Sequence, residues 1–178
     1  MRSEFGKNFV VIALLVAVGL SCKSTQPLGS PHILKSRDGK FQITVPAVMA
    51  ESTTLSTDAE IQAANTPKSL FVFLVTKKKS DFQDGTTLEK VTNTVRDALI
   101  GGFTVNDSPG PESITVDGNP ALRYRLGGTK DGVKLVYVIT NVETPDHFHF
   151  IYSWTDPSHL SENEPILKEI GDSFRVNP

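Results

Sequence analysis

The sequence of 178 residues contains a single cysteine, Cys22, so it cannot form a disulfide within the chain. Positive charge is also sparse: the net charge is −2, and the longest basic run is Lys77–Lys79. Because binding to phosphate requires a concentrated basic face, we expect no nucleic-acid partner. Wholesale disorder is excluded as well, since hydrophobic residues make up 38% of the chain and charged residues 21%.

Motifs of common catalytic sites are missing too. The chain has no Gly-x-Ser-x-Gly elbow, and Gly101-Gly102 follows a predicted helix instead of opening one, as a phosphate-binding loop would. The carboxylate pair Glu162/Glu164 falls at a predicted helix start, where the helix dipole stabilises negative charge. We therefore expect no enzymatic activity and no cofactor.

The N-terminus has the features of an export signal. Its apolar run from Phe9 to Leu20 would extend only about 18 Å as a helix, short of the ~30 Å membrane core. Gly19-Leu-Ser-Cys22 follows directly and resembles the bacterial lipobox, although Gly19 stands where the lipobox usually has leucine. An ordinary secretory signal with an incidental cysteine is the alternative, but the position of the sole cysteine favours lipidation.

These features divide the chain into three predicted segments. Residues 1–21 form a lipoprotein signal peptide, residues 22–32 a lipidated Cys22 with a flexible tether, and residues 33–178 one folded domain. The mature protein is then expected in the bacterial cell envelope, where the lipid on Cys22 holds it to a membrane, facing the periplasm or the cell surface.

The C-terminal third of the sequence predicts a hairpin with an aromatic face. Residues 133–140 form an apolar run, residues 141–146 a turn, and residues 147–154 a strand with an aromatic residue at every second position. Alternate residues of a strand share a face. The side chains on the shared aromatic face are Phe148, Phe150, Tyr152 and Trp154.

The last helix is expected to cover this aromatic face. Its apolar stripe has the spacing of one helix side and consists of Ile166, Leu167, Ile170 and Phe174. Trp154 and Phe174 would then belong to the same core, and removing either ring would be similarly costly. Pro165 is expected in the first turn of this helix, where its missing N–H is harmless.

The strand at residues 70–75 determines the expected number of layers. Leu70-Phe-Val-Phe-Leu-Val75 is apolar on both faces, so the strand should be central and covered from both sides. This strand belongs to a predicted hairpin over residues 60–77. The other predicted elements are a hairpin over residues 33–45, a helix over residues 88–99 and a meander from residue 113, with a turn at residues 127–132. The pattern predicts an α+β domain with three layers.

The order of these elements resembles the PsbP-like superfamily, and within it the bacterial branch that includes the DcrB-like lipoproteins. The motifs that carry the resemblance are Phe41-Gln-Ile-Thr-Val-Pro46, Val116-Asp-Gly-Asn-Pro-Ala121, Trp154-Thr155 and Ile170-Gly-Asp-Ser-Phe174. The resemblance implies an α–β–α sandwich around a central antiparallel sheet. It also implies binding to other proteins, since family members serve as photosystem subunits, envelope lipoproteins or nuclear-transport cofactors, and it supplies no catalytic residue.

Two pairs of polar residues are candidate sites. His147 and His149 lie at i and i+2 of a predicted strand, so both imidazoles face one side and could supply two metal ligands. A stable metal site needs a third and usually a fourth ligand, and none is evident, so we favour two strand histidines without a metal. Arg123 and Arg125 likewise share a face that could receive a carboxylate or phosphate, although acidic neighbours within the fold are the favoured partners.

The sequence therefore supports two functional hypotheses. The first is a non-enzymatic envelope lipoprotein that binds another envelope protein. The alternative is an envelope lipoprotein that binds a small ligand or metal through the His147/His149 or Arg123/Arg125 face. A pocket with convergent polar groups would favour the alternative, and a shallow apolar surface would favour protein binding.

Lipidation of Cys22 can be tested directly. Cys22→Ser should release the protein from membranes, or leave it unprocessed, because the acceptor of the lipid is gone. Membrane fractionation with detergent partitioning measures this. A variant that is cleaved normally and still partitions into detergent as the wild type does would show that the lipoprotein interpretation is wrong.

Overall fold

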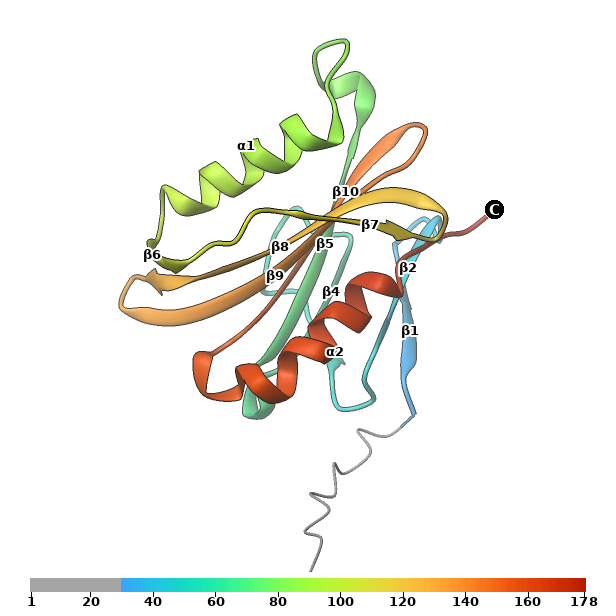
Figure 1. Cartoon of the computed structure of the whole chain (residues 1–178). Helices are drawn as coiled ribbons and strands as arrows, with labels where there is room; N and C mark the ends of the chain where they lie inside the picture. The colour runs from blue at the N-terminus through green and yellow to red at the C-terminus, as the bar shows by residue number, and fades with distance from the viewer. Residues whose placement is uncertain (1–29) are drawn as a thin grey trace, which may run out of the picture.

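The computed structural model describes residues 30–178 (Figure 1). The predicted signal peptide (residues 1–21), Cys22 and residues 23–29 of the predicted tether lie outside the described residues, so those assignments stay predictions. Within residues 30–178, no helix combines the length and apolar character needed to cross a membrane.

The described chain folds into two sheets and two α-helices. The helices are α1 (Leu88–Ile100) and α2 (Leu160–Asp172). The strands are β1 (His32–Lys35), β2 (Phe41–Val45), β3 (Ala50–Glu51), β4 (Ile61–Asn65), β5 (Leu70–Lys78), β6 (Thr104–Asp107), β7 (Glu112–Val116), β8 (Asn119–Lys130), β9 (Val133–Glu143), β10 (His147–Thr155) and β11 (Arg175–Val176). Three single-turn 3-10 helices lie at Thr66–Lys68, Lys79–Asp81 and Pro157–His159.

The larger sheet is antiparallel throughout and has its longest strands at its centre. Its strand order is β3-β4-β5-β10-β9-β8-β6, and β7 also pairs with β8. The predicted hairpins β4–β5 and β9–β10 are both present, and β5 pairs with β10 between them. The doubly apolar strand β5 is therefore central, as the sequence predicts.

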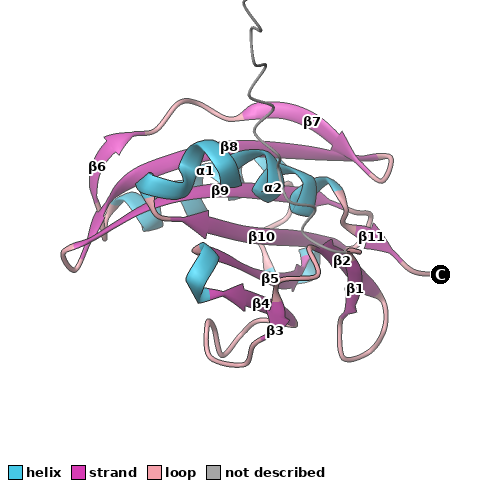
Figure 2. Ribbon diagram, turned by 90° about the horizontal axis from the view of Figure 1, so that it is seen from below, coloured by secondary structure: helices cyan, strands magenta, loops and turns pink. Residues whose placement is uncertain are grey.

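The two faces of this sheet are covered by different elements. Helix α1 lies against one face, whereas α2 lies against the other together with a small sheet of order β1-β2-β11 (Figures 1 and 2). Helix, sheet and helix form three layers, so the predicted α+β class and α–β–α sandwich are confirmed. The small sheet, which the sequence did not separate from the main one, adds to the α2 layer.

The main core lies between the large sheet and α2. Residues from β2, β9, β10, α2 and the segment after α2 are at most 1% exposed: Ile43, Val138, Ile151, Leu167, Ile170 and Phe174. The predicted apolar stripe of the last helix is therefore confirmed, and burial of this many large apolar side chains is the main source of stability for the fold.

The predicted packing of this stripe on the aromatic face of β10 is wrong. Helix α2 lies on the opposite face of β10, with Ile151 in its core, whereas Tyr152 and Trp154 face the α1 side. The α2 face admits a close helix, since a Cβ atom added to Gly171 would lie 2.5 Å from the Thr140 hydroxyl oxygen. Strict alternation identified the two faces of β10 but not which helix covers each.

Two local predictions are also wrong. Strand β8 continues through Gly127 and Gly128, and the turn into β9 is formed by Asp131 and Gly132, both with positive φ. Glycine is needed at position 128 because a Cβ atom there would lie 2.6 Å from the carbonyl oxygen of Thr104 in β6. Pro165 is the sixth residue of α2, not part of its first turn, because the helix begins at Leu160.

Phe174 and Trp154 lie on opposite sides of the large sheet, so replacing each ring by alanine should have a different cost. Phe174→Ala should lower the free energy of unfolding by about 3–5 kcal/mol, because it removes a fully buried ring from the α2 core. Trp154→Ala should cost clearly less, because its ring is only half-buried on the α1 side. Denaturant midpoints measure both. Equal losses would contradict the packing described here.

Candidate functional site

The α1 face of the sheet carries an aromatic surface built by strand register. Trp154 pairs with Phe71 across β5–β10 and with Tyr137 across β9–β10, and Tyr152 pairs with Phe73. The ring centroids of Phe71 and Trp154 are 5.1 Å apart, those of Phe73 and Tyr152 4.7 Å, and those of Tyr137 and Trp154 5.5 Å. All five rings are only half-buried, so they form a continuous aromatic surface that stays partly open to solvent.

Helix α1 covers only part of this face. In its first turn, Leu88 and Val91 pack on Phe148 and Phe150 and are almost fully buried. From Asn93 to Ile100 the residues of α1 are half-buried or exposed, so the C-terminal half of α1 forms a wall beside the aromatic surface instead of a cover. The wall residues of this half are Thr94, Val95 and Leu99.

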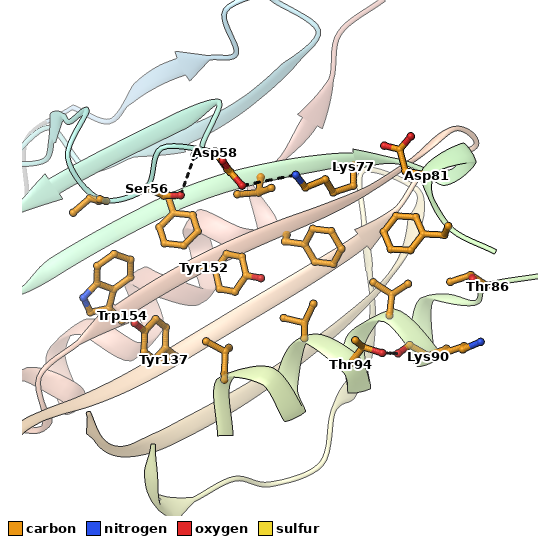
Figure 3. Close-up of a pocket in the computed structure, with 18 of the residues that line it drawn as sticks. Ser56, Asp58, Lys77, Asp81, Thr86, Lys90, Thr94, Tyr137, Tyr152 and Trp154 are labelled. Atoms are coloured by element: carbon orange, nitrogen blue, oxygen red, sulfur yellow. Dashed lines mark hydrogen bonds and ion pairs between the residues drawn. The ribbon is translucent and has the colours of Figure 1, made fainter. Parts of the chain in front are cut away.

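The open part of the face is a groove of about 890 Å³ (Figure 3). We call it the aromatic groove. Its floor consists of Phe73, Val75, Tyr137, Phe150, Tyr152 and Trp154, its second wall contains Leu55 to Asp58, and its far end lies at Asp81–Gln83. In Figure 3, Tyr137 and Trp154 lie at one end, Tyr152 in the middle and Asp81 at the other end. Its volume falls within the range of ligand-binding clefts, roughly 300–1,000 Å³.

Three floor side chains of the groove carry hydrogen-bond donors, whereas the carboxylates and the Gln83 amide lie at its wall and far end. The hydroxyls of Tyr137 and Tyr152 and the indole N–H of Trp154 have no hydrogen-bond partner within residues 30–178. Burial, with a smaller effect of Tyr137, raises the pKa of Tyr152 to about 12, and burial also raises the pKa of Tyr137. Both phenols are therefore neutral, protonated donors at physiological pH.

Charged side chains surround the rim of the groove. The Lys77 ammonium lies 3.9 Å from the Asp58 carboxylate. Lys130 lies over the ring of Phe103, 6.0 Å from its centroid, and neither Lys130 nor Lys90 has an ion-pair partner in the described part of the chain. The arrangement provides a largely apolar floor with hydrogen-bond donors. At its edges lie two lysines and one aspartate, Asp81, without an ion-pair partner among the described residues.

The sequence carries the signals for this groove. Strand β5 is apolar on both faces, and the alternate aromatic residues of β10 from Phe148 to Trp154 share one face. Full cover of both faces is the expectation from this pattern, whereas the structure leaves part of one face open as an aromatic surface, which on a folded domain indicates a binding surface. Which face stays open depends on the position of α1, which local periodicity does not determine.

The predicted histidine pair lies on the other face of the sheet. His149 is fully buried, with Nδ1 3.0 Å from the Thr76 hydroxyl and Nε2 3.1 Å from the Thr144 hydroxyl, so both ring nitrogens are engaged. The His149 ring packs against Phe41 and Phe174, and the half-buried His147 also packs against Phe41. Among residues 30–178, no group of three or more His, Cys, Asp or Glu side chains is placed to hold a metal.

The two arginines also lie on the α2 face, and both contact acidic side chains. Arg123 is buried, donates through Nε to the Thr140 hydroxyl and pairs with Asp172 of α2. Arg125 pairs with Asp107 of β6, and its Nη1 atom lies 3.4 Å from the Glu164 carboxylate. The hydrogen bond to Asp107 is the main cause that raises the pKa of Arg125. These guanidiniums tie α2 and β6 to strand β8. The structure therefore places neither predicted pair in the aromatic groove.

Two solved structures share this fold. Cyanobacterial PsbP (CyanoP) from Synechocystis sp. PCC 6803 matches with a TM-score of 0.58 at 17% identity, over 88% of this chain and 98% of its own. LpqN, described as involved in cell envelope biogenesis of Mycobacterium tuberculosis, matches with a TM-score of 0.62 at 13% identity, over 84% and 91%. No family model matches the sequence, and no curated protein does. The domain has the PsbP-like fold that the sequence motifs indicated.

Burial of His149 predicts a specific dependence of stability on pH. Burial, with a smaller effect of His147, lowers the pKa of His149 to about 3, whereas the unfolded residue has a pKa near ~6.5. Below pH 6.5 the unfolded chain therefore binds a proton that the folded chain does not. The free energy of unfolding should decrease as the pH falls from 6.5 towards 3, by up to ~1.4 kcal/mol per pH unit from this residue.

The measurement compares denaturant unfolding at pH 6.5 and pH 5, above the range in which most carboxylates titrate. His149→Gln should flatten the decrease, whatever its effect on absolute stability, because glutamine does not titrate. His147→Gln, at the half-exposed neighbour, is the control and should keep most of the decrease. An unchanged pH dependence in His149→Gln would show that His149 is not held neutral by burial.

Proposed function

We propose that this protein is a non-enzymatic lipoprotein of the bacterial cell envelope, anchored through Cys22, that holds a segment of a partner envelope protein in the aromatic groove. The observation that carries the proposal is the half-open face formed by β5, β9, β10 and one side of α1. A folded domain gains stability by covering such rings, so leaving five of them half-buried favours a surface that is covered by something else.

The alternative faces support binding less well. Both arginines contact acidic side chains of the same domain, and His149 is fully buried with its two ring nitrogens engaged. A ligand at either place would have to break these contacts. In the groove, the floor rings and the donors of Tyr152 and Trp154 are available without any rearrangement of the fold.

The lining of the groove also favours binding over catalysis. Besides its apolar residues it contains serine, threonine, tyrosine, glutamine, lysine and aspartate side chains, without histidine or cysteine. The Asp58 carboxylate lies beside Lys77, the Ser56 hydroxyl accepts a hydrogen bond from the Asp58 backbone N–H, and Asp81 is exposed at the far end. Covalent catalysis requires a nucleophile hydrogen-bonded to a base, and this arrangement is better suited to binding.

The envelope location is supported by the N-terminal sequence and by one comparison. The apolar run and the lipobox-like Gly19-Leu-Ser-Cys22 precede the domain, and LpqN, which shares the fold, is described as involved in cell envelope biogenesis. The chain enters the domain at β1, in the α2 layer, whereas α1 and the groove lie on the opposite face (Figure 1). An anchored domain would therefore keep the groove accessible.

Site-specific photo-crosslinking in native membranes tests the proposal. A photoreactive phenylalanine analogue at Thr94, exposed on the groove wall, should give one discrete adduct whose mass exceeds that of the protein by that of a second protein. The same analogue at Ala98, exposed on α1 but outside the groove, is the matched control and should give no such adduct.

The groove should also be required for the adduct. Leu99→Glu places a charge on the groove wall and should abolish the Thr94 adduct, whereas Ala98→Glu, one residue away on the exposed side of the helix, should leave it unchanged. Thermal melting checks that both variants fold. An adduct that survives Leu99→Glu would contradict protein binding in the groove, and a mass increase of only a few hundred daltons would favour the small-ligand alternative.

A further inference from the structure

The chemistry of the aromatic groove restricts the kind of segment that fits it. Along the floor, the free polar atoms are the hydroxyls of Tyr137 and Tyr152 and the indole N–H of Trp154, with the ammonium groups of Lys90 and Lys130 at the rim. Indole and ammonium groups can only donate hydrogen bonds, and neutral phenols donate readily. An occupant that matches this surface therefore has apolar bulk together with unpaired acceptors along its length.

The secondary structure of the floor excludes one kind of peptide. Strands β9 and β10 are paired on both sides, and β5 is paired on both sides from Phe71 to Leu74, so the backbone groups under the aromatic rings are already used in the sheet. A strand cannot be added there by edge pairing. A helix is a poorer match for a different reason: its backbone carbonyl groups accept bonds from its own backbone, so only its side chains would be left to accept from Tyr152 and Trp154.

A polyproline II segment fits both requirements. This conformation has no internal hydrogen bonds, so its carbonyl oxygens are free to accept, and proline rings pack well on aromatic side chains. The floor between Phe150 and Trp154 spans four residues of β10, or about 14 Å. At about 3.1 Å per residue, this length accommodates four to five residues of a polyproline II segment.

The rim charges indicate the flanking sequence. Three lysines line the groove, Lys77, Lys90 and Lys130, against two acidic residues, Asp58 and Asp81, which gives 3 − 2 = +1 on a chain whose net charge is −2. Lys77 is already close to Asp58. Among the described residues, Lys90 on α1, Lys130 at the end of β8 and Asp81 at the far end have no ion-pair partner, so one positive charge remains in excess. Acidic side chains on either side of an apolar segment complement the two lysines.

We infer that the aromatic groove recognises an extended, proline-rich segment of a partner protein, flanked by acidic residues. The inference rests on the proposed function and specifies the conformation and charge of the partner segment. A saturated acyl chain lacks acceptors along its length, and an oligosaccharide would leave many hydroxyls against the apolar centre formed by Val75, Val91 and Phe150.

The test measures binding of fluorescent peptides to the mature lipoprotein in lipid nanodiscs by anisotropy. The main probe is a peptide of five prolines with two glutamates at each end. The matched probes replace the glutamates by lysines, or the prolines by a helix-forming run of alanine and leucine. We expect the proline–glutamate peptide to bind at least about tenfold more tightly than either matched probe.

Three variants locate the binding. Tyr137→Phe with Tyr152→Phe keeps both rings but removes two donors, and should weaken binding of the proline–glutamate peptide by about tenfold. Lys90→Gln with Lys130→Gln should weaken it and reduce its salt dependence. Leu99→Glu should abolish it, and Ala98→Glu should leave it unchanged.

Several results would overturn the inference. The first is tighter binding of the alanine–leucine peptide than of the proline–glutamate peptide. The second is binding of dodecyl maltoside monomers or a chitin trisaccharide while no proline peptide binds. The third is binding of the proline–glutamate peptide that Leu99→Glu does not weaken. If the Thr94 photo-adduct forms in membranes and depends on Leu99 while the proline peptides fail, the groove binds a partner of another conformation and this inference alone is wrong. If the photo-adduct fails as well, the proposed function is wrong.

Discussion

The pairing of β5 with β10 at the centre of an antiparallel sheet is the constraint on which the rest of the structure depends. Both strands carry large apolar side chains on both faces, so each face of the sheet needs a cover. On one side, α2 and the small β1-β2-β11 sheet bury Ile151 and its neighbours completely. On the other side, the cover is a single helix, which is fully packed only at its N-terminal end, from Leu88 to Thr92.

This unequal covering connects the fold to a function. The α2 side contains the buried core, the engaged arginines and the neutral His149, and it gives the domain its stability. The α1 side contains half-exposed rings whose burial is incomplete within the domain. A stable layer thus supports the sheet from one side, while the opposite face keeps its aromatic rings half-exposed, and the proposed binding function rests on this difference.

The sequence predicted the elements, the fold class and the central position of β5, because periodicity and turn residues report local structure. It did not predict which helix covers the aromatic face of β10. Trp154 was placed under α2 since both helices carry an apolar stripe, and only long-range contacts, such as that of Gly171 with Thr140, decide between them. The His147/His149 and Arg123/Arg125 pairs were identified by their spacing, but their partners, Thr76 and Asp172 among them, come from distant segments.

The central claim is that the face carrying Trp154 is open in the free domain and occupied in the cell envelope. Hydroxyl-radical footprinting with mass spectrometry measures this most directly, with the buried Phe174 as internal reference. The account predicts that Trp154 is oxidised readily in the purified mature protein and is protected in native membranes, while Phe174 resists oxidation in both. Resistance of Trp154 in the purified protein would contradict the open face, and equal oxidation of Trp154 in both preparations would contradict its occupation.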